Sequence, residues 1–147
     1  MVEGAGFGTC SHLLIGDDRG ESASLELYGN QCFEVDHGER LPRHTNHYVG
    51  APRDQSGDLL LPNSHGRWDR AEALLADGVD QSVERFERLL LDRKGTNAIC
   101  GAWFPVGPFK LGTVCSIIMD LPAREMHITP GHPREHGFET VRLSSAI

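Results

Sequence analysis

The sequence has no excess of basic residues. Its 14 lysines and arginines are outnumbered by 21 aspartates and glutamates, which gives a formal net charge of −7. Because nucleic-acid binding depends on cationic contacts to phosphates, we expect no nucleic-acid partner. The chain also has no apolar run near the ~20 residues that span a bilayer, and no basic amphipathic stretch. We therefore expect no membrane partner.

Paired cysteines are missing as well. The four cysteines stand at positions 10, 32, 100 and 115, and no two of them form a Cys-x-x-Cys pair. This spacing argues against a zinc ribbon or a thioredoxin-type site. Residues 1–10 have neither the basic nor the apolar region of a signal peptide, so we expect a cytoplasmic protein with free thiols. Cys32 and Cys115 are expected to be buried.

Several motifs that identify enzyme classes are also lacking. There is no Gly-x-Ser-x-Gly elbow, no Walker loop and no His-Glu-x-x-His pair. The glycines of residues 4–8 lack the third glycine and the preceding strand of a dinucleotide fingerprint. No cofactor is predicted, and residues 1–9 are expected to be a flexible N-terminus.

What is present is a mixed pattern of strands and helices. Alternation over residues 22–28 and the Gly29-Asn30 pair before residues 31–35 predict a tight hairpin. Ala23, Leu25 and Leu27 share one face of this hairpin and Ser24 and Glu26 the other. Further strands are predicted at 11–15, 113–119, 125–129 and 140–143, the run 113–119 being buried on both faces.

Two helices complete the pattern. One is predicted from about Ser64, and a second is predicted to begin with Asp80 as its N-cap and to end before Gly95. The fold class is therefore α+β, with antiparallel hairpins plus a helical pair. We expect a single domain over residues 10–147.

Histidines are numerous, with eight in 147 residues. His44 and His47 are three apart, and His132 and His136 are four apart, which on a helix could place two nitrogens on one metal. Neither pair lies in a helical pattern, and no nearby residue completes a ligand set. We predict no metal ligand, although a small His-rich metal-binding domain stays open as a hypothesis.

Asn46 lies between two of these histidines in a polar loop. A buried asparagine amide can hold an oxyanion through its N–H donors. The same residue can instead form an Asx-type turn, and the local pattern alone favours the turn.

Five short segments add more information through their order along the chain. The most specific is His44-Thr45-Asn46-His47-Tyr48. The others are Ser11–Ile15 with the acidic strand Leu25-Glu26-Leu27, the helix start Ser64–Arg70, the pair Ile99-Cys100, and the strand hairpin Thr113–Pro133. Together, from about residue 10 to 135, they resemble the family of acyl-coenzyme A:6-aminopenicillanic acid acyltransferases, the penicillin acyltransferases, and their bacterial hydrolase relatives.

This resemblance implies part of an αββα sandwich of an autoproteolytic N-terminal-nucleophile hydrolase. In that family a new N-terminal cysteine attacks an amide or thioester carbonyl, and its own α-amino group serves as the base. The resemblance assigns Asn46 to oxyanion or substrate positioning, with His44 and His47 as supports. Ser11 or Cys10 would line the site.

Two departures from the family pattern bear on function. The family nucleophile precedes the matching segments, and Cys10 follows Thr9 rather than glycine, so we expect the nucleophile in an upstream segment. The Ser-Ile-Cys-Arg segment reads Ala98-Ile99-Cys100-Gly101, without its serine and arginine.

The chain would then be the C-terminal part of an acyltransferase or amide hydrolase. Its substrate would be a small-molecule acyl donor or amide, and its partner the upstream half of the enzyme or a second copy. The alternative is a noncatalytic remnant or a binding module.

Overall fold

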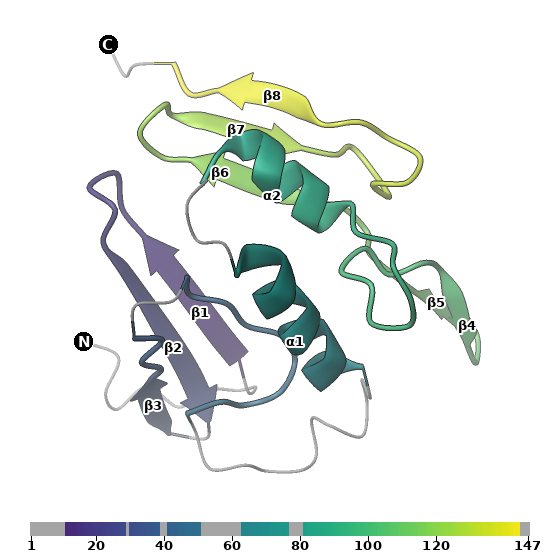
Figure 1. The fold of residues 1–147 in the computed structure, drawn as a ribbon, viewed down its shortest axis with the longest axis horizontal. Coiled ribbons are helices and arrows are strands. Elements are labelled where there is room, and N and C mark those ends of the chain that lie inside the picture. Colours follow the sequence, from purple (N-terminus) through teal and green to yellow (C-terminus); the bar gives the residue numbers. More distant parts are fainter. Residues whose placement is uncertain (1–10, 29, 39–40, 51–62, 77–80, 145–147) are drawn as a thin grey trace. The chain divides into compact units, whose positions relative to one another are not determined.

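The computed structural model describes residues 11–28, 30–38, 41–50, 63–76 and 81–144 (Figure 1). They belong to two compact units, Met1–Trp68 and Asp69–Ile147, whose boundary falls within helix α1 (Ser64–Leu75). The predicted flexible N-terminus at residues 1–9 lies outside the described residues. The single domain over residues 10–147 stays a prediction.

The first unit is built on an antiparallel sheet with the strand order β1-β2-β3, visible in purple in Figure 1. Its strands are β1 (Ser11–Gly16), β2 (Ser22–Tyr28) and β3 (Gln31–Glu34). Tyr28 pairs with Gln31, which confirms the predicted two-residue hairpin connection. Glu26 pairs with Phe33 without a bulge, so these two side chains share a face of the sheet.

Two polar side chains of the central strand β2 are buried, whereas three apolar side chains of the edge strand β1, Leu13, Leu14 and Ile15, are exposed. Leu13 and Ile15 on the apolar face are 43% and 52% exposed. On the other face, Ser24 and Glu26 are 3% and 0% exposed. The chain from residue 44 to residue 50 hydrogen-bonds to Glu26 and covers this part of the face, which explains the burial of Glu26.

The second unit contains helix α2 (Val83–Leu90) and an antiparallel sheet with the order β6-β7-β8. The helix packs against β6, as Figure 1 shows. Ser82 is its N-cap and accepts the Arg85 N–H at 3.3 Å, whereas the predicted cap, Asp80, lies outside the described residues. The strands are β6 (Ile117–Asp120), β7 (Glu125–Ile128) and β8 (Glu139–Arg142).

A separate hairpin, β4 (Phe104–Val106) with β5 (Phe109–Leu111), is missed by the sequence patterns. Its two-residue connection begins at Gly107, whose φ of 58° suits glycine. The sequence patterns miss β4 because it contains Pro105, and proline normally argues against a strand. A two-stranded sheet has only edge strands, where a missing N–H donor is tolerated.

The prediction that residues 113–119 are buried on both faces is wrong. Ser116 is 5% exposed, but Val114 and Met119 are 65% and 64% exposed. Cys32 and Cys115 are likewise exposed, and Cys100 is buried among the three cysteines that the structure describes. The exposed side chains lie on sheet faces or loops that the described part of the chain does not cover.

The predicted α+β class is confirmed by the antiparallel sheets and the two helices. Neither of the helices in the described ranges has the length and apolar character needed to cross a membrane.

Candidate functional site

A buried carboxylate holds the loop that contains the His44–Tyr48 motif. Glu26 lies in the middle of β2, and its Oε1 accepts hydrogen bonds from His44 Nε2 at 2.8 Å and from the Val49 N–H at 2.6 Å. Its Oε2 accepts the Gly50 N–H at 2.9 Å. Burial of a carboxylate is unfavourable unless donors surround it, and here the donors come from both ends of the loop. Glu26 therefore fixes the loop to the sheet.

The C-terminal end of the loop packs closely on the sheet. The Tyr48 hydroxyl donates to the Leu27 carbonyl at 3.2 Å. At Gly50 an added Cβ would lie 3.3 Å from Cγ2 of Val35, which is buried, and 3.7 Å from Oε2 of Glu26. The distance to Glu26 is an ordinary contact, whereas the one to Val35 is tight, so a larger residue at position 50 would require the Val35 side chain to shift.

The tip of the loop is fastened to the first turn of α1. Ser64 is 1% exposed, and its Oγ accepts the Asn46 backbone N–H at 2.8 Å. The same Oγ lies 3.0 Å from Thr45 Oγ1 and 2.9 Å from His47 Nδ1. The Thr45 hydroxyl in turn donates to the Ser64 carbonyl at 3.1 Å. One serine side chain thereby organises three consecutive loop residues.

Aromatic rings complete the packing around His47. The His47 and His65 rings have centroids 3.8 Å apart, and the Trp68 ring lies 5.6 Å from His47 in an edge arrangement. The Arg43 guanidinium carbon lies 4.4 Å from the centroid of the Trp68 ring, a cation–π contact. These contacts limit the motion of the loop.

Asn46 is exposed on this fastened loop. Its Oδ1 accepts a hydrogen bond from Arg67 Nη2 at 2.6 Å. A guanidinium only donates, so the amide oxygen must be the atom that faces Arg67. Within the described ranges the Nδ2 group has no hydrogen-bond partner, and its N–H donors are therefore available to a ligand.

A second polar cluster lies on the same face of the sheet. The His44 ring stacks on His12 with centroids 3.6 Å apart and 4° between the planes. The Ser24 Oγ lies 3.0 Å from His12 Nε2 and 2.9 Å from His37 Nε2. Because a hydroxyl has a single hydrogen, Ser24 can donate to only one of the two imidazoles, so at least one of the rings donates an N–H to the Ser24 Oγ.

This environment favours the neutral imidazoles. Burial, together with nearby His44, lowers the pKa of His12 to about 4, against a smaller opposing effect of Glu26. Burial also lowers the pKa of His37, and Arg43 and His44 act in the same direction. Both rings are therefore uncharged at neutral pH.

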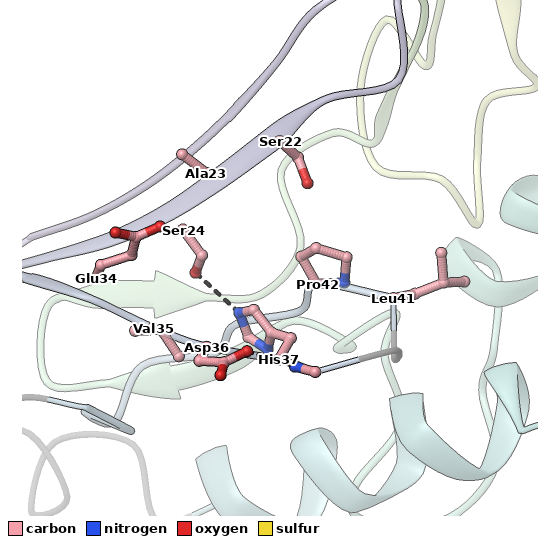
Figure 2. Close-up of a pocket in the computed structure, with 10 residues that line it drawn as sticks. Ser22, Ala23, Ser24, Glu34, Val35, Asp36, His37, Leu41 and Pro42 are labelled. Atoms are coloured by element: carbon pink, nitrogen blue, oxygen red, sulfur yellow. Dashed lines mark hydrogen bonds between the residues drawn. The ribbon is translucent and has the colours of Figure 1, made fainter.

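A pocket of about 330 Å³ opens beside His37. Figure 2 shows the His37 ring reaching Ser24, with Leu41 and Pro42 on the facing segment. The pocket is lined by Ser22, Ala23, Ser24, Glu34, Val35, Asp36, His37, Gly38, Leu41 and Pro42. Its wall is thus mostly polar, and it adjoins the cluster that supports the loop.

In the second unit, Asp92 organises the segment that contains Ala98–Gly101. Its carboxylate accepts two hydrogen bonds from Arg70, at 2.6 and 3.1 Å, and one from the Ile99 N–H at 3.3 Å. Arg70 lowers the pKa of Asp92 by hydrogen bonding to it. Arg134 donates to the Cys100 carbonyl at 3.0 Å and so fixes the same segment from the other side.

The structure places the predicted site residues as follows. His44 bonds to Glu26 and His47 to Ser64, so both hold the loop that carries Asn46. Cys10 lies outside the described residues, and of Ser11 the structure describes only the backbone, at the start of β1. The role assigned to this set stays a prediction.

The sequence analysis did not single out the residues that fix the loop and the cluster. Ser64 and Arg67 stand three apart in the helix-start segment, and this spacing is a signal that could have found them. For Glu26, Ser24 and His12 the strand alternation gave no such signal. In the part of the chain that is described, no group of three or more His, Cys, Asp or Glu side chains could hold a metal ion.

The structure therefore defines an α+β protein that presents an asparagine amide on a loop fixed at several points. The family model described as acyl-coenzyme A:6-aminopenicillanic acid acyl-transferase matches residues 3–135. The chain belongs to this family, which confirms the resemblance found in the sequence. No curated protein matches the chain.

We predict that Glu26→Gln lowers the free energy of unfolding by about 1–3 kcal/mol, because an acceptor oxygen becomes a donor that faces other donors. Urea denaturation followed by circular dichroism measures this change. Glu34→Gln, at an exposed position of the neighbouring strand, is the matched control and should change stability by less than about 0.5 kcal/mol. Equal stability of the two variants would contradict the role of Glu26.

We also predict that acid weakens the fold through His12. Its ordinary pKa of 6.5 falls to about 4 in the folded chain, so between these values the unfolded chain binds a proton that the folded chain does not. The contribution of His12 to the free energy of unfolding is then fully present above pH 6.5 and is lost as the pH falls towards 4. The urea midpoint measured from pH 4.5 to 7.5 should show this slope.

The matched variants for the acid effect are His12→Gln and His136→Gln. The first should reduce the slope to the part that comes from His37, whose pKa burial also lowers, and the second, at an exposed histidine, should keep the full slope. A His12→Gln variant with the original slope would show that another group causes the acid sensitivity.

Proposed function

We propose that this chain is the C-terminal part of an autoproteolytic acyltransferase or amide hydrolase and that Asn46 is its oxyanion donor. The observation that carries the proposal is the Asn46 amide, with Oδ1 engaged by Arg67 at 2.6 Å and its N–H donors directed to no described residue. An oxyanion hole requires donors held in place before the charge develops. Membership of the acyltransferase family supports the assignment.

The proposed reaction begins at a cysteine on a segment upstream of the family match. Its α-amino group takes the thiol proton, and the sulfur forms a bond to the carbonyl carbon of an amide or thioester. The carbonyl oxygen becomes an oxyanion that accepts hydrogen bonds from Asn46 Nδ2. The bond to the leaving amine or thiol then breaks, the leaving group takes the proton, and the acyl group passes to an amine acceptor or to water.

His44 and His47 would act as supports in this reaction. Each bonds to a residue buried beneath the loop, Glu26 or Ser64, so each holds the backbone from which the Asn46 side chain extends. Ser11, the first residue of the edge strand β1, or Cys10, which precedes it in the sequence, would line the site. The substrates would be a small-molecule acyl donor and an amide or amine, without a cofactor, in the cytoplasm.

The exposed apolar side chains support the proposed partner. Leu13 and Ile15 on the first sheet, and Ile117, Met119 and Val141 on the second, are each more than 40% exposed. Exposed apolar patches of this kind commonly mark protein interfaces. We propose that further layers of an αββα sandwich, from the upstream half of the enzyme or a second copy, cover them.

A noncatalytic remnant or a binding module is the second candidate. The observation that favours it is Gly101, which stands where the family segment has arginine. Gly101 can contribute only its backbone, which bonds to Thr113 and His132. A remnant of this kind would keep the fold without acyl transfer.

If Asn46 is the oxyanion donor, Asn46→Ala should lower kcat by a factor of about 10²–10³, because one donor is removed. Asn46→Asp should show a loss of similar size, since it keeps the oxygen that faces Arg67 and replaces the donor group with an acceptor. The measurement is kcat for acyl release by this chain combined with the polypeptide encoded directly upstream.

Asn30→Ala, at an exposed turn position, is the control and should keep the original kcat. An Asn46→Asp variant as active as the unsubstituted chain would reject the donor role. A combination without any acyl-transfer activity would favour the noncatalytic candidate.

The partner proposal predicts that the isolated chain associates through its apolar faces. The thermal midpoint should rise with protein concentration, and sedimentation should give a mass above 16.2 kDa. Met119→Lys should shift the chain towards a monomer, because a charge would be buried in the interface. Thr140→Lys, on the opposite face of the same sheet, is the control. A sharp melting transition of a monomer, independent of concentration, would contradict the proposal.

A further inference from the structure

We infer that Arg67 is a positioning residue that selects the orientation of the Asn46 amide, and this inference rests on the proposed function. Arg67 lies in the first turn of α1, three residues after Ser64. Residues three apart share a face of a helix. The same helix face therefore binds Asn46 twice, at its backbone N–H through Ser64 and at its side-chain Oδ1 through Arg67.

The side-chain contact is needed in addition to the backbone contact because an asparagine amide is nearly symmetric in shape. A rotation by 180° exchanges Oδ1 and Nδ2 with little change in volume. In one orientation the oxygen meets Arg67 and the N–H donors point outward. In the other orientation N–H groups would face the guanidinium, and the outward oxygen would repel an oxyanion. A residue that only donates hydrogen bonds allows just the first orientation.

No carboxylate among the described residues forms an ion pair with Arg67. Among the described residues its hydrogen-bond partner is Asn46, whereas Arg70, one turn further along α1, forms an ion pair with Asp92 at 2.6 Å. Arg67 and Arg70, both near the start of α1, thus have different roles. Arg70 holds a structural ion pair, and Arg67 places a positive charge behind the amide that would bind the developing negative charge.

The first test compares Arg67→Met and Arg67→Lys in the combined enzyme. Arg67→Met should lower kcat about 10- to 100-fold with little change in KM, because the amide loses its fixed direction. Arg67→Lys keeps a charged donor and should recover part of the loss. In the Asn46→Ala background Arg67→Met should have no further effect on kcat, since the amide that it orients is gone.

A purely structural role of Arg67 gives a different result. It would lower kcat by the same factor in both backgrounds, and this outcome would overturn the inference. Circular dichroism of each variant shows whether the chain is folded, and Arg67→Lys keeps the test valid if Arg67→Met does not fold.

A second measurement does not depend on activity. In the ¹⁵N-labelled chain, the side-chain NH₂ signal of Asn46 is identified by its loss in Asn46→Asp, and its heteronuclear NOE reports its order on the picosecond to nanosecond timescale. The NOE should be high in the unsubstituted chain and should fall in Arg67→Met, with the Asn30 signal as control. An unchanged NOE would overturn the inference. A fallen NOE without any enzyme activity would instead reject the proposed function and leave the Arg67 contact established.

Discussion

The buried carboxylate of Glu26 is the interaction on which the first unit depends. It lies in the central strand of a three-stranded sheet, and its partners come from a segment about twenty residues later in the chain. A carboxylate that leaves water must recover its hydrogen bonds inside the protein. The loop from His44 to Gly50 supplies them, so the burial of one charge also determines where that loop lies.

The loop is then fixed from a second direction by α1. Ser64 binds the backbone of Asn46, and Arg67 binds its side-chain oxygen, whereas Glu26 holds the two ends of the loop. Residues from a strand and a helix thus hold the loop that carries one exposed amide. A donor held by several independent contacts loses little entropy when it binds a ligand, which is the property that stabilisation of a transition state requires.

The same structure leaves much apolar surface uncovered. Among the described residues the buried apolar side chains are Leu27, Val35, Ala98 and Cys100, while Phe109, Met119 and Leu143 are more than 60% exposed. Hydrophobic burial is the main favourable contribution to folding, so a chain with this distribution gains from any partner that covers these faces. The polar loop and the exposed apolar faces support the proposal that the chain works as part of a larger assembly.

The sequence by itself determined the hairpin of β2 and β3, the start of α1, the α+β class and the family, because alternation, turn residues and motif order are local properties. It did not determine burial. Ser24 and Glu26 are buried and Met119 is exposed, contrary to the usual rule, since burial depends on which distant segment covers each face. Asn46 was a candidate from its motif, but the direction of its amide was decided by Arg67, twenty-one residues away in sequence. Only the tertiary structure brings those two side chains together.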